Sequence, residues 1–221
     1  MTPILLDFVN KCAAEGAEPD RILDLIEQDE QVSDAYYREL ERMSHNCIGA
    51  AAGNVFVLPL MTPTECDALL DNIAEYDFTP NLEEGAEYRI EEAVLEKVDP
   101  GAYESLKEFL LPVLNAYCLM INSTPITKVV SFQVAKYRPE GTPGTGWHHD
   151  KESDFTAVIS LNPGSFEGGG TGIRMTPHAT CDLPPLEQGH GLIFNGRCVQ
   201  HRGLPVTKGE RLLLVCWCST K

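Results

Sequence analysis

The sequence has 221 residues, of which 43% are hydrophobic and 23% are charged. This is enough chain for one globular domain with a small appendage, and the composition excludes wholesale disorder. The net charge is -16, and it is uneven: residues 1–120 carry -18 and residues 121–221 carry +2. So acidic a first half argues against nucleic acid and anionic membranes as binding surfaces, and it permits a basic protein partner.

Residues 1–45 predict two or three short acidic helices. Thr2 and Pro3 offer a cap and a first-turn proline, and apolar residues then recur at helical spacing until Gly16. Further helical patterns follow Pro19 and Ser33. We expect this segment to be an acidic helical extension that packs on a domain formed by residues 46–221. The alternative is an arm that binds a protein partner or a second copy of the chain.

The next stretch mixes one strand with helices. An apolar run at residues 55–58 predicts a strand, and Thr62 with Glu65 three residues later forms a capping box at the start of a helix. Residues 77–98 are acidic and irregular, and we expect a mobile loop there. Asp99 and Pro100 then begin a longer helix.

After residue 121 short β-rich runs alternate with glycine and proline turns, at residues 127–137, 154–162, 171–176, 190–195 and 211–217. Such punctuation predicts a β sandwich or barrel. The fold class is therefore α+β, with a β core mainly in residues 121–221 and helices packed on it.

The cysteines and the N-terminus indicate a reducing compartment. The sequence has eight cysteines but no CxxC pair, so we expect reduced core thiols rather than disulfides or a zinc site. Asp7 interrupts the first apolar run and no basic leader precedes it, which makes a signal peptide a poor interpretation. No apolar run approaches the roughly 18 residues of a membrane span. We expect a cytoplasmic protein.

One triplet carries most of the chemical information. His148 and Asp150 are separated by one residue, so in extended backbone both side chains point to one side, while His149 points away. His201 is the candidate for a third ligand. Two histidines and one carboxylate on one face of a metal form the facial triad of non-haem Fe(II) oxygenases. The triplet alone is a weak signal, and His149 in place of His148 is an alternative.

Arg211 strengthens that interpretation. It lies ten residues after His201, at the start of an apolar run that predicts a buried strand. A buried guanidinium needs an anionic partner, and it can bind a carboxylate through two parallel hydrogen bonds. A diacid cosubstrate would supply that partner.

Six pieces of sequence, taken in order, resemble the Fe(II)/2-oxoglutarate-dependent dioxygenases of the prolyl 4-hydroxylase and procollagen lysyl hydroxylase group. They are residues 134–137, 147–150, 155–162, 166–171, 191–194 and 201–211. The resemblance implies a double-stranded β-helix (jelly roll), with His148, Asp150 and His201 as iron ligands and Arg211 on the distal carboxylate of 2-oxoglutarate. It further implies cosubstrate contacts for Tyr137, Thr156, Ser160 and Thr207, where Ser160 replaces a bulkier tyrosine of some members.

The resemblance implies a hydroxylase that uses Fe(II), 2-oxoglutarate and O2, with ascorbate as an accessory reductant. It would couple hydroxylation of a peptidyl proline or lysine to formation of succinate and CO2. One alternative is a hydroxylase of a free amino acid or another small molecule. A second is an inactive metal-binding jelly-roll module that binds a partner. The glycines at residues 168–170 predict a tight turn rather than a phosphate loop.

Overall fold

The structure is a computed structural model that describes residues 1–50, 52–82, 85 and 89–221. The helices of the described ranges are α1 (Pro3–Ala14), α2 (Pro19–Gln28), α3 (Glu30–His45), α4 (Pro63–Ile73), α5 (Leu95–Val98) and α6 (Pro100–Asn122). The strands are β1 (Cys47–Ala50), β2 (Gly53–Pro59), β3 (Thr79–Pro80), β4 (Glu91–Val94), β5 (Lys128–Tyr137), β6 (Phe155–Ser160), β7 (Phe166–Gly168), β8 (Thr171–Thr176), β9 (Ala179–Leu183), β10 (His190–Phe194), β11 (His201–Gly203), β12 (Val206–Gly209) and β13 (Arg211–Ser219).

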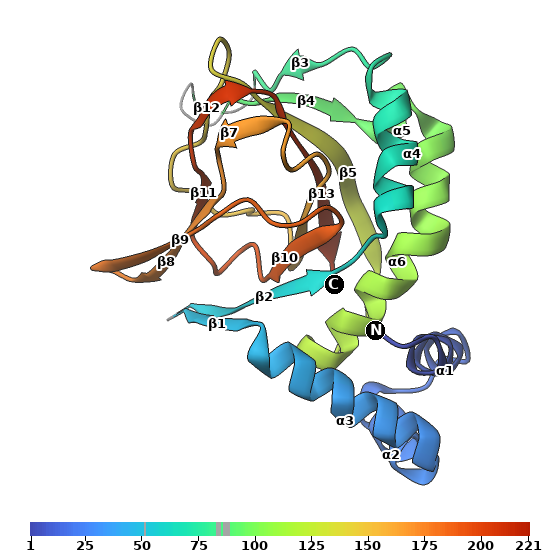
Figure 1. The fold of residues 1–221 in the computed structure, drawn as a ribbon. Helices are drawn as coiled ribbons and strands as arrows, with labels where there is room; N and C mark the ends of the chain where they lie inside the picture. The colour runs from blue at the N-terminus through green and yellow to red at the C-terminus, as the bar shows by residue number, and fades with distance from the viewer. Residues whose placement is uncertain (51, 83–84, 86–88) are drawn as a thin grey trace.

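A large antiparallel sheet curves along the side of the barrel that faces the helices, from β2 past β5 to β4 (Figure 1). Within the described ranges its eight strands run in the order β1-β2-β10-β6-β13-β5-β4-β3. β13 is central and pairs with β5 on one side and β6 on the other. This position explains the apolar run at residues 212–218 of β13, because a strand with neighbours on both edges and layers on both faces is almost fully buried; only Trp217 is half-buried.

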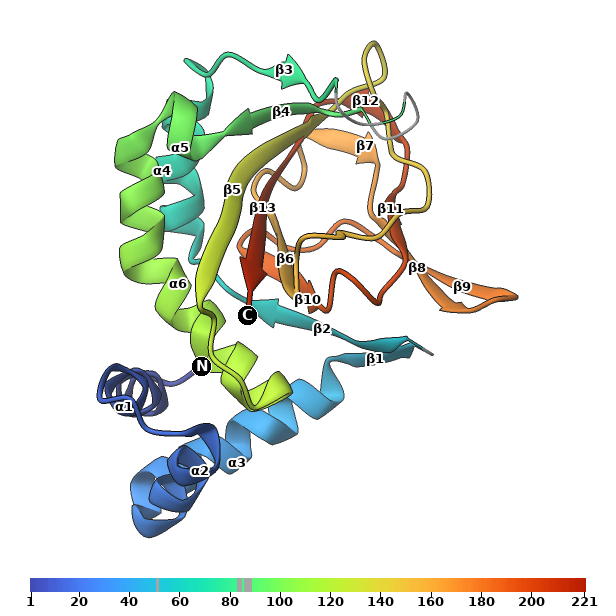
Figure 2. The same ribbon diagram turned by 180° about the vertical axis from the view of Figure 1, so that it is seen from behind.

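Helices α4, α5 and α6 cover the outer face of this sheet, as both ribbon views show (Figures 1 and 2). The predicted capping box begins α4: Thr62 accepts a hydrogen bond from the Glu65 amide, and the Glu65 carboxylate accepts one from the Thr62 amide. Leucines of α6 at helical spacing, Leu106, Leu110 and Leu114, are buried in the core beneath the sheet. The helices therefore supply the main apolar core and leave the inner face of the sheet free to line a barrel.

Two small sheets close the barrel from the opposite side. One runs β11-β8-β9 and the other pairs β12 with β7, and the β8–β9 hairpin projects beyond the barrel wall (Figure 1). Leu192 and Phe194 of β10 pack inside against Ile173 of β8, while Val206 of β12 packs against Leu213 of β13. The predicted β core with supporting helices is confirmed.

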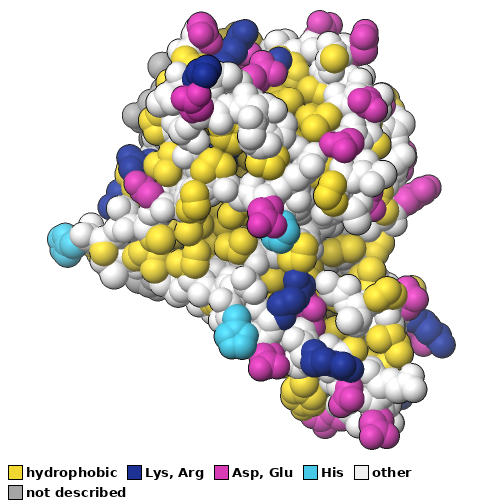
Figure 3. Space-filling view, in the orientation of Figure 1, with side chains coloured by type: hydrophobic (Ala, Val, Ile, Leu, Met, Phe, Trp, Pro, Cys, Tyr) yellow, Lys and Arg dark blue, Asp and Glu magenta, His cyan; other side chains and the backbone are white. Residues whose placement is uncertain are grey.

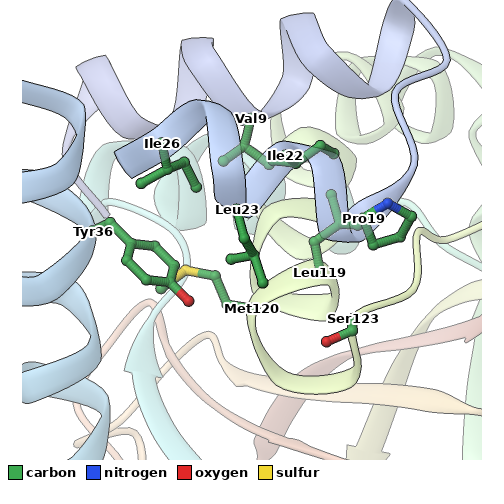
Figure 4. A pocket seen from close by; sticks show the side chains of 9 residues that line it. All are labelled: Val9, Pro19, Ile22, Leu23, Ile26, Tyr36, Leu119, Met120 and Ser123. Atoms are coloured by element: carbon green, nitrogen blue, oxygen red, sulfur yellow. The ribbon is translucent and has the colours of Figure 1, made fainter. Parts of the chain in front are cut away.

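Helices α1–α3 form an arm beside the end of α6. Figure 4 shows side chains of α2, among them Ile22 and Leu23, facing Leu119 and Met120 of α6 around a small apolar pocket. α3 ends at His45 and β1 begins at Cys47, where the sequence places the domain boundary. Acidic and basic side chains are interspersed over the arm's outer surface (Figure 3).

Some expectations need correction. The third helix begins at Glu30 rather than near Ser33, because Asp29 accepts hydrogen bonds from the Gln31 and Val32 amides and caps it. The expected loop at 77–98 contains β3, β4 and α5; its residues 83–84 and 86–88 lie outside the described residues.

All eight cysteines carry free thiols. No helix in the described ranges is long and apolar enough to cross a membrane.

Candidate metal centre

The segment around residues 145–150 brings His148 and Asp150 to β11. His148 and His201 exchange two backbone hydrogen bonds, at 2.9 and 3.0 Å, and the Asp150 amide donates to the Gly196 carbonyl at 2.9 Å. The turn after β10 therefore fixes Asp150, and a β bridge fixes the two histidines opposite each other. This is the local reason why His201 meets two residues that lie more than 50 positions before it in the chain.

The three side chains converge as the sequence predicts. His148 Nε2 lies 3.8 Å and His201 Nε2 lies 3.7 Å from Asp150 Oδ1, and the possible ligand atoms all lie within 4.8 Å of one another. The two nitrogen–oxygen distances are too long for hydrogen bonds, yet short enough for one ion to contact all three groups. His149 is exposed and lies outside the cluster, so the alternative ligand is wrong.

Each imidazole is oriented by a backbone carbonyl. His148 Nδ1 lies 2.9 Å from the Gly146 oxygen, and His201 Nδ1 lies 3.2 Å from the Val199 oxygen. A carbonyl can only accept, so Nδ1 carries the proton and the lone pair of Nε2 points to the centre. Burial lowers the pKa of His201 to about 4, against the opposing effect of Asp150. The ring is therefore neutral at pH 7, which is the form that binds a metal.

A chain of hydroxyl groups orients the carboxylate of Asp150. Thr156 Oγ1 donates to Asp150 Oδ2 at 2.9 Å and lies 2.8 Å from Ser153 Oγ, which accepts from the Cys218 amide. Thr156 and Ser153 are fully buried. The resemblance implies a cosubstrate contact for Thr156, which stays a prediction. In the structure the Thr156 hydroxyl donates to Asp150 Oδ2, and Asp150 Oδ1 is the oxygen nearer the histidines.

Arg211 enters the barrel interior at the start of β13. Its side chain donates to the Gly170 carbonyl at 2.7 Å, and its guanidinium carbon lies 5.6 Å from the centre of the Tyr137 ring. Only 5% of Arg211 is exposed, and among the described residues no carboxylate forms an ion pair with it. Because arginine stays charged in proteins, this buried cation lacks the anion that it needs.

A small cavity lies beside this guanidinium. Its walls are mostly aliphatic, and its polar groups are the guanidinium and the hydroxyls of Ser160 and Thr171. The lining residues are Val158, Ser160, Thr171, Leu183, Pro184, Leu186, Leu192, Arg211 and Leu213. A cavity with one cationic end and apolar walls suits a short carboxylic acid that lies with its carboxylate on Arg211.

Of the remaining predicted cosubstrate residues, two lie in the barrel interior and one is exposed to solvent. Ser160 lines the cavity and Tyr137 is buried next to Arg211. Thr207 is exposed on β12 and does not line this cavity, so its contact with the cosubstrate stays a prediction. Thr171 was not predicted; it directly follows the glycine run that lets the chain approach Arg211.

The glycines at 168–170 form the expected tight turn. All three have positive φ, and a Cβ at Gly170 would lie 2.2 Å from the Leu183 carbonyl oxygen. The Gly169 amide donates to the Pro205 carbonyl at 2.7 Å, while the Gly170 carbonyl accepts from Arg211. The turn therefore positions a backbone acceptor for the guanidinium.

The donor set fits the groups that the sequence implies. Two imidazoles and a carboxylate, each held by a second hydrogen bond, match the ligands of non-haem Fe(II). The unpaired guanidinium matches a diacid. Burial raises the pKa of Tyr137, and the nearby Arg211 guanidinium opposes this shift.

Comparisons with known proteins agree with this geometry. Residues 132–219 match the family model of the 2OG-Fe(II) oxygenase superfamily. Procollagen-lysine,2-oxoglutarate 5-dioxygenase 1 of Gallus gallus is 28% identical over 172 residues, covering 73% of this chain and 23% of that protein. The multifunctional procollagen lysine hydroxylase and glycosyltransferase of Caenorhabditis elegans is 37% identical over 83 residues, which is 37% of this chain and 11% of that protein. The chain thus spans less than a quarter of these relatives.

Solved structures show the same fold. A Pseudomonas putida prolyl-4-hydroxylase has a TM-score of 0.61 at 20% identity, with 77% of this chain and 95% of that chain covered. A Trichoplax adhaerens prolyl hydroxylase in complex with a hypoxia inducible factor peptide has a TM-score of 0.63 at 16% identity. The match covers 87% of this chain and 94% of that chain. The predicted resemblance and the jelly-roll fold are confirmed.

Proposed function

We propose that this protein, whose residues 132–219 match the 2OG-Fe(II) oxygenase superfamily, is a dioxygenase that hydroxylates a peptidyl proline or lysine side chain. One observation carries the proposal: a His-Asp-His cluster and a buried, unpaired guanidinium share the interior of one barrel. A structural histidine cluster would not need the cation, and a structural arginine would have a carboxylate partner.

The residues divide the work as follows. His148 and His201 would hold Fe(II) through ring nitrogens, and Asp150 would hold it through a carboxylate oxygen. Arg211, with the hydroxyls of Ser160 and Thr171, would hold the far carboxylate of 2-oxoglutarate. When bound, iron and 2-oxoglutarate supply the oxidising chemistry: one O2 converts 2-oxoglutarate to succinate and CO2 and converts a substrate C–H to C–OH.

The choice of a peptidyl substrate rests on the relatives. By their names, the Gallus gallus protein acts on procollagen lysine and the Pseudomonas putida structure is a prolyl hydroxylase. We propose the same class of side chain here. Ascorbate would act only as an accessory reductant.

Succinate formation tests the proposal. The protein is incubated with Fe(II), 2-oxoglutarate and pools of proline- and lysine-containing peptides, and products are read as a gain of one oxygen by mass spectrometry. Asp150→Ala should abolish metal binding and turnover. Arg211→Ala should keep the metal and raise the 2-oxoglutarate concentration needed for half-maximal rate by about tenfold or more. Arg38→Ala, an exposed arginine of the arm, is the matched control.

Two results would count against the proposal. Succinate formed with free amino acids but with no peptide would assign the protein to small-molecule hydroxylation. No succinate with any pool, together with intact metal binding, would make it an inactive binding module.

We also propose that residues 1–45 are an extension of a catalytic domain formed by residues 46–221, and that the protein works in the cytoplasm. Eight free thiols support a reducing compartment. Cell fractionation, read with an antibody to the chain, tests the second point; recovery in a secreted fraction would contradict it.

A further inference from the structure

The outer surface of the small sheet is built from the same strands that hold the metal ligands. Segment 145–148 pairs with β11, β11 with β8, and β8 with β9. His201 and Ile173 face inward, since both are buried in the barrel. The alternate residues Trp147, Arg202 and Arg174 therefore face outward, because successive side chains of a strand point to opposite faces.

These three outward residues form one stack. The guanidinium carbon of Arg174 lies 4.4 Å and that of Arg202 lies 4.6 Å from the centre of the Trp147 ring. Each distance is well within the range of a cation–π contact. Two cations therefore share one aromatic ring, so the tryptophan concentrates positive charge at a fixed place.

The Arg202 side chain packs directly on Gly172, which has no side chain to obstruct it. A Cβ at this glycine would come within 3.0 Å of Arg202 Cγ and Nε and of Asp182 Oδ1. The arginine thus runs flat across the glycine toward Asp182, and the two charged groups are 3.7 Å apart. We call Trp147, Gly172, Arg174 and Arg202 the arginine platform.

The platform holds more cation than the surrounding protein neutralises. Asp182 faces Arg202 only, and among the described residues no carboxylate forms an ion pair with Arg174. The Nε atoms of both arginines are buried without a hydrogen-bond partner. In a chain of net charge -16, this is a local excess of positive charge with unused donors.

We propose that the arginine platform binds an acidic side chain of the peptide substrate, and so selects peptides with Asp or Glu near the residue to be modified. This inference rests on the proposed function. Two arguments support a peptide. Trp147 adjoins His148 and Arg202 adjoins His201 in the chain, so the platform is rigidly linked to the centre. A planar guanidinium also recognises a carboxylate through paired hydrogen bonds.

A nucleic acid is disfavoured as the occupant. Binding of a polyanion depends on many cations in contact with successive phosphates, whereas the acidic first half of this chain repels such a partner. One or two carboxylates on a short peptide need only the local charge of the platform.

Binding measured without turnover tests the platform directly. Two fluorescein-labelled peptides of equal length, each containing a proline and a lysine, carry either glutamates or glutamines at the flanking positions. Fluorescence anisotropy with the full chain should show tighter binding of the glutamate peptide. Arg174→Gln and Arg202→Gln should each weaken it about fivefold without affecting the glutamine peptide. Arg38→Gln makes the same charge change on the arm and should have no effect.

A gain of binding provides the complementary test. Asp182→Asn removes the carboxylate that competes for Arg202, and it should strengthen binding of the glutamate peptide. Equal binding of both peptides, or indifference to Arg174→Gln and Asp182→Asn, would overturn the platform. Tighter binding of a labelled oligonucleotide than of the glutamate peptide would assign it to nucleic acid instead.

The two proposals fail separately. Absence of succinate formation with a preserved preference for the glutamate peptide would remove the hydroxylase and keep the platform as a peptide-binding surface. Succinate formation that is equal for acidic and neutral peptides would remove the platform and keep the hydroxylase.

Discussion

Thr156 is a positioning residue for the metal ligand rather than a ligand itself. Its buried hydroxyl holds Asp150 Oδ2, which leaves Oδ1 toward the histidines. We expect Thr156→Val, which keeps the shape and removes the hydroxyl, to lower the affinity for Co(II) about ten- to a hundredfold. Isothermal titration of the metal-free protein with Co(II) measures this effect without turnover.

Thr156→Ser is the matched control, because it keeps the hydroxyl and should keep most of the affinity. Equal Co(II) affinity in the valine variant and the wild type would show that backbone contacts alone fix Asp150.

His148 and Asp150 could be predicted because their spacing is a property of extended backbone, whereas His201 and Arg211 depended on the resemblance as well. Other side chains depend on registers that sequence does not reveal. Thr207 lies at the register shift between Val206 and Lys208, and its side chain is exposed. Thr171 lines the cavity because it lies opposite Leu183 and Gly203 in neighbouring strands. Such positions follow from pairing between distant segments.

The arm is joined to α6 by buried polar contacts as well as by apolar packing. The Tyr117 hydroxyl of α6 donates to Glu39 Oε1 of α3 at 2.8 Å, and Arg42 donates to both groups. We expect Tyr117→Phe to lower the free energy of unfolding by about 1–2 kcal/mol, since Glu39 and Arg42 lose a buried partner. Thermal unfolding measures this loss.

Tyr37→Phe is the control, because Tyr37 is exposed and should tolerate the change. The 2-oxoglutarate requirement should be unchanged in both variants, because α6 lies on the far side of the sheet from Arg211. An unfolding midpoint equal to that of the wild type would show that the hydroxyl adds nothing to the junction.

Asp154 connects the end of β13 to the loop after Asp150. It accepts hydrogen bonds from Ser219 at 2.9 Å, from the Thr220 amide at 3.1 Å and from Arg197 at 2.6 Å. Burial raises its pKa, but these donors outweigh burial and leave the pKa below its usual value. The folded protein thus favours the charged form, so this stabilisation is present above about pH 4 and declines as pH falls through the folded-state pKa.

We therefore expect Asp154→Asn to reduce stability by about 1–3 kcal/mol at pH 7 and to approach the wild type at acidic pH. Unfolding midpoints measured from pH 7 down to about pH 3 test this convergence. A constant difference across that range would contradict the assignment.

Long elements could be predicted and short ones could not. The central strands β5, β6 and β13 have six to ten residues with strong apolar patterns. β11 has only three residues, and the 145–148 segment is joined to it by an isolated bridge, so neither produces a periodic signal. The acidic sequence around β4 and α5 gives no clear strand or helix pattern. β4 forms despite its charge because it pairs with β5.

Metal binding should stabilise the whole molecule. The centre joins a loop segment to β11, and only the folded chain brings the ligands together. At a metal concentration about a hundred times the dissociation constant, binding should raise the free energy of unfolding by about 2.7 kcal/mol. For a chain of this size, we expect Co(II) to raise the unfolding midpoint by about 5–10 °C over the protein in EDTA.

Asp150→Ala should lose this shift, which separates specific binding from general ionic effects. An equal rise in that variant would place the bound ion elsewhere.

The charge is distributed unevenly over the whole molecule. Acidic side chains concentrate in residues 1–120, whereas the ligands, Arg211 and the arginine platform all lie in residues 121–221.

The reciprocal backbone hydrogen bonds between His148 and His201 determine how the ion is loaded. The backbones of both histidines are hydrogen-bonded to each other, so the ligands are preorganised. An arriving ion then needs only to exchange its bound water for these ligands. Loading should then follow the water-exchange rate of each ion and not the pace of a chain rearrangement. A stopped-flow comparison of fast- and slow-exchanging divalent ions would show this as a large spread in association rates.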